Sequence, residues 1–128
     1  PYATWAGSNN IANINQSSSY FSNATISQSG VNDSSAVVSQ AGSGNNANVI
    51  QANSLYAMTA NVAQTGDSNL AGITQDDSYF ATAGITQNGN GNIAGITQTN
   101  MSDGSGAIID QMGNGSSDQS VRPWLWHG

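Results

Sequence analysis

Apolar and polar residues alternate along most of this chain, in short segments that follow one another at nearly constant spacing. Residues 92–98 read Asn-Ile-Ala-Gly-Ile-Thr-Gln, so that Ala94, Ile96 and Gln98 stand two residues apart. A period of two places these side chains on one face of a β-strand, whereas a helix needs a period near 3.6. The segment therefore predicts a strand with one face turned toward a core.

Segments of this kind occur nine times along the chain, counting the one at residues 92–98. Nine glutamines follow one another at spacings of 11 to 13 residues: Gln16, Gln28, Gln40, Gln51, Gln64, Gln75, Gln87, Gln98 and Gln111. Each follows an alanine by four residues and an isoleucine or valine by two, which predicts a core of Ala12, Ile14, Ala24, Ile26, Ala36, Val38, Ala47, Val49, Ala60, Val62, Ala71, Ile73, Ala83, Ile85, Ala94, Ile96, Ala107 and Ile109. Asparagine or serine precedes the glutamine by six residues in seven copies, at Asn10, Ser22, Ser34, Asn45, Asn69, Asn92 and Ser105.

Two topologies fit strands at this spacing. An antiparallel meander pairs neighbouring copies, whereas a solenoid with two strands per coil pairs copies that are two apart, in parallel. Copies two apart are separated by a steadier 23 or 24 residues, and the solenoid stacks like residues on like. We therefore expect an all-β fold, a two-sheet parallel β-solenoid of about 4.5 coils with nine strand–turn units. The solenoid domain covers residues 9–117, between tails at residues 1–8 and 118–128.

This arrangement also predicts which side chains point into the interior. The two strands of one coil run in opposite directions on facing sheets, so the alanine of one strand lies opposite the isoleucine or valine of the other. Small side chains then meet large ones, as a close-packed interior requires. The glutamines and the Asn/Ser residues share the inward face, where buried amides need hydrogen-bond partners. We expect them to form amide ladders along the stack.

The low content of charged residues and the negative net charge limit the kinds of partner that are expected. Only 6% of residues are charged, against about 25% in an ordinary globular domain, and Arg122 is the one cation in a chain of net charge −6. Nucleic acid and anionic membrane surfaces both require clustered cations, so neither is an expected partner. No apolar run approaches the length of a membrane span. The chain has no cysteine, which excludes a disulfide framework.

Catalytic and metal-binding patterns are missing from the sequence. The only histidine is His127, and neither a hydrolytic triad nor a zinc site can be built around it. Calcium-binding solenoids repeat every nine residues, whereas this period is about twelve. Only Thr74 and Thr97 would stack on one face, which is a poor ice-binding plane. We expect no enzyme activity, no catalytic residue, no metal and no cofactor.

Aromatic residues occupy three of the connections and leave two interpretations open. They can grip a polysaccharide or a neighbouring fibril, or they can fold over the ends of the sandwich as local caps. The residues concerned are Tyr20, Phe21, Tyr56, Tyr79 and Phe80.

The repeat resembles the curlin repeats of curli subunits, which are secreted functional amyloids of bacterial biofilms. The resemblance covers residues 9–117 and is carried by the Ser/Asn-x5-Gln units Ser22–Gln28, Ser34–Gln40, Asn45–Gln51, Asn69–Gln75, Asn92–Gln98 and Ser105–Gln111. It implies a two-sheet β-solenoid, export to the cell surface, and head-to-tail polymerisation. The chain is more similar to the major fibre subunit, because the nucleating type tends to have a basic last repeat. A nucleator subunit and a secretion channel are then implied partners.

The two apolar tails lie outside the repeat. Polymerisation would bring them together, so we expect subunit-junction contacts from Trp5, Arg122, Trp124, Leu125 and Trp126; the alternative is a disordered end. The chain starts at Pro1 and not at a methionine, which is typical of a processed or trimmed product. The expected function is that of an extracellular structural subunit that assembles into curli-like fibrils of the biofilm matrix. The alternative is a monomeric cell-surface β-solenoid that binds carbohydrate or ice.

Overall fold

A computed structural model describes residues 1–100 and 104–122, and the elements in this part of the chain are all β-strands. The strands are β1 (Tyr2–Ser8), β2 (Ile11–Ser17), β3 (Asn23–Asn32), β4 (Ser35–Ala41), β5 (Asn46–Ser54), β6 (Thr59–Thr65), β7 (Leu70–Asp76), β8 (Thr82–Asn88), β9 (Ile93–Thr99), β10 (Gly106–Met112) and β11 (Ser117–Arg122). A membrane-spanning helix is not found in the described ranges.

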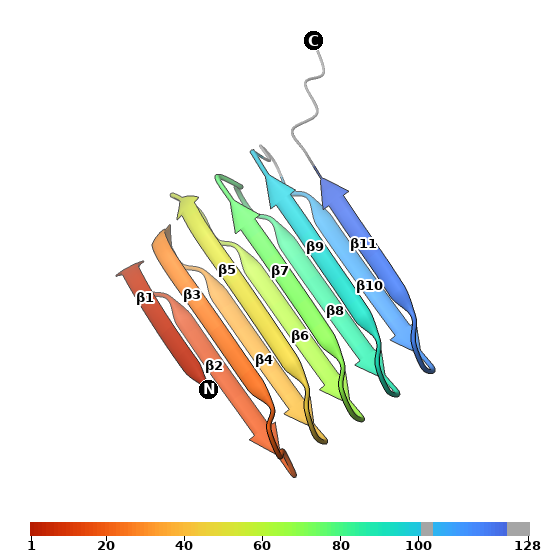
Figure 1. Cartoon of the computed structure of the whole chain (residues 1–128). Helices are drawn as coiled ribbons and strands as arrows, with labels where there is room; N and C mark the ends of the chain where they lie inside the picture. The colour runs from red at the N-terminus through yellow and green to blue at the C-terminus, as the bar shows by residue number, and fades with distance from the viewer. Residues whose placement is uncertain (101–103, 123–128) are drawn as a thin grey trace.

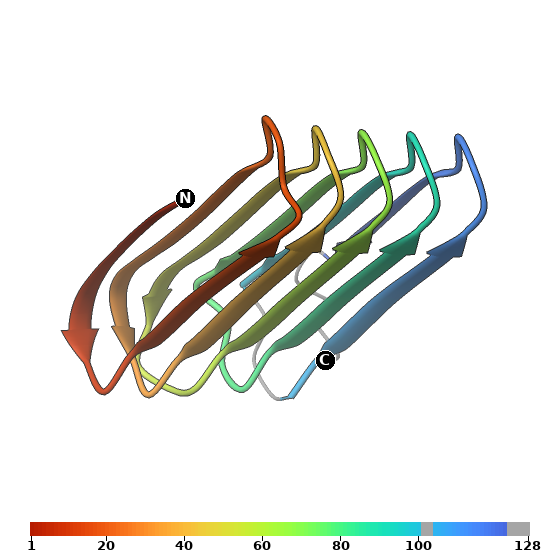
Figure 2. The ribbon, with the colours of Figure 1, turned by 90° about the horizontal axis from the view of Figure 1, so that it is seen from below.

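The strands form two parallel sheets that face each other (Figure 1). One sheet has the order β1-β3-β5-β7-β9-β11, and the other has the order β10-β8-β6-β4-β2. The chain therefore alternates between the sheets, and each pair of strands completes one coil (Figure 2). Each strand pairs in parallel with the strand two places away, which confirms the predicted two-sheet parallel β-solenoid.

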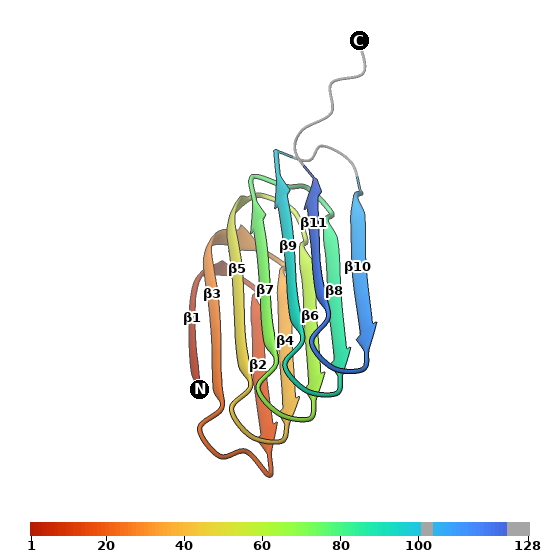
Figure 3. The same cartoon turned by 45° about the vertical axis from the view of Figure 1, so that its right-hand side comes forward.

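The solenoid is longer than the nine strand units that the sequence predicts. β1 lies in the segment assigned to the N-terminal tail, and β11 lies mostly in the segment assigned to the C-terminal tail. Neither strand carries the Ala-x-Ile-x-Gln pattern, but each pairs with a strand that does: β1 with β3, and β11 with β9. The open edge of the neighbouring strand supplies the hydrogen bonds that make these segments extended. Figure 3 shows β1 and β2 at one end of the stack and β10 and β11 at the other.

Stacked strands are in register, with like residues on like. In the six-stranded sheet Ile26 pairs with Val49, Val49 with Ile73, and Ile73 with Ile96. The alanines and the isoleucines or valines from β3 to β10 are buried and form one continuous core. Ala12 and Ile14 of β2 pack against this core but are only partly buried, because the next strand of their sheet is absent on one side.

The connections depend on backbone conformations with positive φ. The residue two places after each of the nine glutamines has positive φ: Ser18, Gly30, Gly42, Asn53, Gly66, Asp77, Gly89, Asn100 and Gly113. At one edge of the solenoid these residues are glycines in all copies except the first, which has Ser18. The φ is +126° at Gly89 and +116° at Gly113, and a Cβ on Gly89 would lie 2.0 Å from the carbonyl oxygen of Gly113. Successive turns therefore stack more closely than a side chain allows.

Candidate functional site

Two columns of glutamines run through the core, one in each sheet. In the six-stranded sheet, Nε2 of each glutamine donates to Oε1 of the glutamine in the next coil, at 2.8 Å for Gln28 to Gln51, 2.9 Å for Gln51 to Gln75 and 2.8 Å for Gln75 to Gln98. The five-stranded sheet repeats this arrangement through Gln16, Gln40, Gln64, Gln87 and Gln111. The glutamines from Gln28 onward are buried.

The same amide groups also tie the two sheets together. Gln75 Nε2 donates to the carbonyl oxygen of Thr59 at 3.2 Å, and Gln87 Nε2 donates to that of Leu70 at 2.9 Å. These carbonyls belong to the first residue of a strand in the facing sheet. The glutamine end of each strand therefore lies opposite the starting end of its neighbour, and alanine lies opposite isoleucine or valine. In the glutamines from Gln40 to Gln87, each amide nitrogen thus donates once along the stack and once across it.

The Asn/Ser positions divide between the two edges of the solenoid. At the glycine-rich edge, Asn45, Asn69 and Asn92 donate from Nδ2 to the carbonyl oxygens of Gly66, Gly89 and Gly113, at 2.7, 2.8 and 2.8 Å. Their Oδ1 atoms accept backbone N–H groups from the next coil, and the last acceptance is from Ser116. Ser22 starts this column, because its hydroxyl oxygen accepts the N–H of Asn45 at 3.1 Å.

The opposite edge does not keep a continuous polar column. Asn10 Oδ1 accepts the N–H of Ser34, and Ser34 Oγ accepts the N–H of Met58. Met58 and Ala81 then take the Asn/Ser position and form a small buried apolar cluster with Val31. At the end of this column the residue is polar again: it is Ser105, whose Oγ accepts a hydrogen bond from Gln98 Nε2 at 3.4 Å.

A further ladder, which the repeat pattern alone does not indicate, runs through the glycine-rich turns. The backbone N–H of Ser43 donates to Asp67 Oδ1 at 2.8 Å, that of Asp67 to Asn90 Oδ1 at 2.8 Å, and that of Asn90 to Asn114 Oδ1 at 2.9 Å. Asp67 thus uses a carboxylate oxygen within the stack of turns. The described residues contain no group of three or more His, Cys, Asp or Glu side chains that could hold a metal ion.

The glutamine columns are directional, so the two ends of the solenoid differ chemically. Every column bond points its donor toward the C-terminal end, which leaves Oε1 acceptors at the N-terminal end. Gln28 is 1% exposed, and its Oε1 has no hydrogen-bond partner among the described residues. Trp5 of β1 occupies the preceding register position, where its side chain is 63% exposed. The indole of Trp5 has no amide group, so it cannot continue the column of hydrogen bonds between glutamines.

The C-terminal end replaces the repeat residues with polar ones. In β11, Asp118, Ser120 and Arg122 pair in register with Ala94, Ile96 and Gln98 of β9. Gln111 Nε2 at the end of its column donates to Asp118 Oδ2 at 3.0 Å. The backbone of Arg122 belongs to β11, but its side chain and the predicted junction residues Trp124, Leu125 and Trp126 lie outside the described part of the structure.

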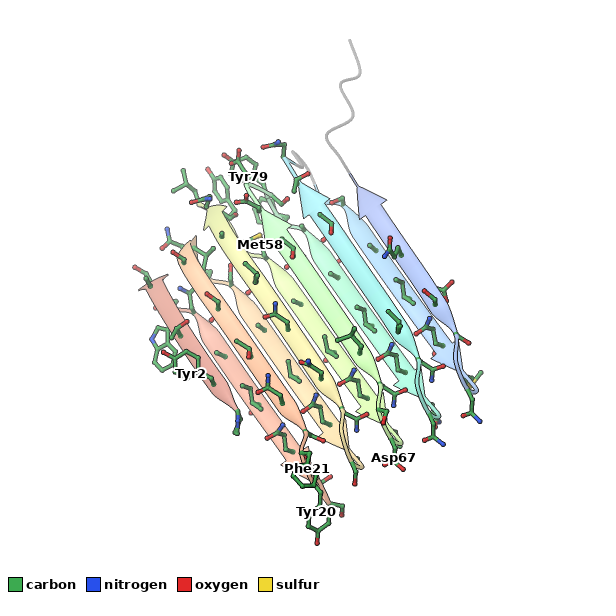
Figure 4. All side chains as sticks on the ribbon, in the orientation of Figure 1. Tyr2, Tyr20, Phe21, Met58, Asp67 and Tyr79 are labelled. Atoms are coloured by element: carbon green, nitrogen blue, oxygen red, sulfur yellow. The ribbon has the colours of Figure 1, made fainter. Side chains whose placement is uncertain are left out.

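The aromatic residues gather at two separate edges. Tyr56 contacts Tyr79 edge to face at a centroid distance of 5.5 Å and stacks on Phe80 at 5.3 Å. Tyr20 and Phe21 lie at the opposite edge, near β2 and β3 (Figure 4), where Phe21 is 99% exposed. The first group covers a connection as a local cap would, whereas the second extends into solvent.

Replacing Tyr56 with alanine is expected to lower the free energy of unfolding by about 1–3 kcal/mol, because each aromatic pair contributes about 0.5–1.5 kcal/mol. Tyr20→Ala is the matched control and should change it by less than about 0.5 kcal/mol. Urea denaturation followed by circular dichroism measures both variants. Equal effects of the two substitutions would show that the Tyr56 cluster does not act as a cap.

Comparisons of the chain with protein-family models, with curated proteins and with solved structures find no match.

Proposed function

We propose that this chain is an extracellular structural subunit that polymerises head to tail into curli-like functional amyloid fibrils of the cell surface and biofilm matrix. It acts by assembly and not by catalysis. The resemblance of residues 9–117 to curlin repeats supports the same assignment, and with it a nucleator subunit and a secretion channel as partners.

The observation that carries the proposal is the complementarity of the two ends. Both sheets end in strands with an unpaired edge, β1 and β2 at one end and β10 and β11 at the other. Exposed sheet edges pair with further strands, and contacts between different surfaces of identical subunits extend without closing. The directional glutamine columns favour one sense of addition, since acceptors are left at the N-terminal end and donors point to the C-terminal end.

The distribution of charge fits a stacked polymer. Within β2 to β10, which are described throughout, the charged residues are Asp76 and Asp110 only. Parallel in-register strands place identical residues about 4.8 Å apart along the stack, where like charges repel. Few charged side chains in the strands therefore allow many copies to stack.

Electron microscopy and fibre diffraction test the proposal. Purified chain at increasing concentration should form filaments with a meridional reflection near 4.7–4.8 Å, and added fragments of these filaments should shorten the lag before growth. A chain that stays a stable monomer at every concentration, with and without fragments, would contradict it.

The alternative is a monomeric cell-surface β-solenoid that binds carbohydrate or ice, and one observation favours it. Asp118 occupies an inward register position in β11, paired with Ala94, and inward-pointing charges are one way in which proteins block edge-to-edge pairing. A monomer in size-exclusion chromatography that binds glycans or produces thermal hysteresis would support this alternative.

A further inference from the structure

The two sheets of the solenoid are staggered by half a coil. Gln28 Nε2 of β3 donates both to the carbonyl oxygen of Ile11 in β2 and to that of Ser34 just before β4, at 3.1 and 3.2 Å. Gln98 of β9 likewise reaches the carbonyls of Thr82 and Ser105, on either side of it. Each strand therefore lies at a height midway between two strands of the facing sheet, and each step along the chain rises about 2.4 Å, half of the roughly 4.8 Å strand spacing.

The number of strands decides how a second copy can continue both sheets. Six strands lie in one sheet and five in the other, so β1 and β11 belong to the same sheet. If the next copy had the same orientation, its β1 would sit on β11 and its β2 would be two strand spacings above β10. One strand would then be missing from the five-stranded sheet. The backbone groups next to that gap would face the interior without partners, which is costly.

We infer that successive copies of this chain are related by a half-turn about the fibre axis, so that β1 of the next copy pairs with β10 and its β2 pairs with β11. This inference rests on the proposed function. A half-turn exchanges the two sheets and reverses the strand direction, so parallel pairing is kept on both sides. The stagger then continues across the junction with no strand missing.

The half-turn also matches the chemistry of the two ends. In this arrangement Gln16 of the next copy takes the register position that follows Arg122, and its Oε1 stands at the acceptor end of its own column. Trp5 of the next copy follows Gln111, whose Nε2 already donates to Asp118 Oδ2. The indole N–H is a donor, and a carboxylate has acceptor capacity for more than one bond. Asp118 thereby gains a second hydrogen-bond partner at the junction.

Disulfide trapping tests the arrangement, because the chain has no cysteine of its own. Asn13, Tyr2 and Gln119 hold the same central outward register position in β2, β1 and β11. The half-turn stacks Asn13 of one copy directly on Gln119 of another, whereas the unrotated arrangement stacks Tyr2 on Gln119. Adjacent parallel strands bring Cα atoms within the roughly 4.4–6.8 Å that a disulfide spans.

We expect filaments of the double variant Asn13→Cys/Gln119→Cys to give a ladder of covalent oligomers on a non-reducing gel after oxidation. Filaments of the matched variant Tyr2→Cys/Gln119→Cys should give only the monomer band on the same non-reducing gel. In Tyr2→Cys/Gln119→Cys an internal disulfide is prevented by the four strands between β1 and β11. In Asn13→Cys/Gln119→Cys it is prevented because β2 and β11 lie in different sheets at opposite ends. A ladder from the Tyr2 variant alone, or from neither variant, would overturn the half-turn.

Electron cryomicroscopy of wild-type filaments gives a second measurement that needs no substitution. The half-turn predicts a subunit repeat of about 26 Å with a rotation near 180°, from eleven half-steps of about 2.4 Å. Unrotated stacking predicts about 29 Å, because the missing strand adds one further rise of about 2.4 Å. Filaments with the longer repeat would overturn this inference and leave the proposed function intact, whereas a wild-type chain without filaments would overturn both.

Discussion

Replacing Gln75 with glutamate should destabilise the fold strongly at pH 7 and much less at pH 4. Gln75 is 0% exposed. Its Nε2 donates to Gln98 Oε1 at 2.8 Å and to the Thr59 carbonyl oxygen at 3.2 Å, while its Oε1 accepts from Gln51 at 2.9 Å. An ionised carboxylate only accepts hydrogen bonds, so it would face two acceptors without a proton to share. The variant must either bury an unpaired charge or take up a proton.

Burial raises the pKa of the introduced carboxyl above its ordinary value of about 4.3. Because the folded-state pKa is then higher than the unfolded one, the penalty is absent below about pH 4 and grows as the pH rises toward the folded-state pKa. Keeping the carboxyl protonated at pH 7 costs about 3–4 kcal/mol, and the lost hydrogen bond adds about 1 kcal/mol. Urea denaturation at both pH values, with the wild type as reference, measures the difference.

Gln119→Glu is the control for this experiment, because Gln119 is an exposed, outward residue of β11. Its free energy of unfolding should stay within about 0.5 kcal/mol of the wild type at both pH values. A Gln75→Glu variant that is equally stable relative to the wild type at pH 4 and pH 7 would show that Gln75 is not the buried donor described above.

Replacing Gly89 with alanine should also have a large effect, this time through the backbone. Gly89 has a φ of +126°, and the added Cβ would lie 2.0 Å from the carbonyl oxygen of Gly113. The contact is with backbone, which cannot rotate away as a side chain would. Backbone strain costs about 1–3 kcal/mol and overpacking about 1–3 kcal/mol, so the free energy of unfolding should fall by about 2–6 kcal/mol.

Gly91→Ala is the matched control, because it lies in the same turn. Gly91 has a φ of +69°, and no atom lies within 4 Å of where its Cβ would be. Only the left-handed backbone conformation is then unfavourable, which costs about 1–2 kcal/mol. Thermal or urea denaturation compares the two variants. If Gly91→Ala were as destabilising as Gly89→Ala, close stacking of the turns would not be the reason for glycine at position 89.

Much of the fold could be predicted because each repeat contains the alternation of apolar and polar residues that identifies its inward face. Alternation in residues 92–98 shows one inward face, and the steady separation of copies two apart indicates parallel stacking. The inward positions of Ile73 and Gln75 follow from the same alternation, since a shift of one residue would turn every apolar side chain outward. The structure places both residues in the interior.

The terminal strands could not be predicted in this way. β1 and β11 lack the repeat pattern, and Asp118 and Arg122 stand where alanine and glutamine are expected. Such a segment becomes a strand only because a neighbouring strand offers unpaired N–H and C=O groups. Strand preference depends on this context more than on the segment itself.

The sequence by itself determined the strands of the repeat, their inward faces and their parallel stacking, because these depend on local alternation and constant spacing. Only the tertiary structure decided the direction of the glutamine columns, the division of the Asn/Ser positions between two edges, and the buried cluster around Met58. It also decided the positive φ of Asn53 and Asp77 in the connections. These features depend on which groups of adjacent coils meet, and a hydrogen-bond partner 23 or 24 residues away is known only once the coils are stacked.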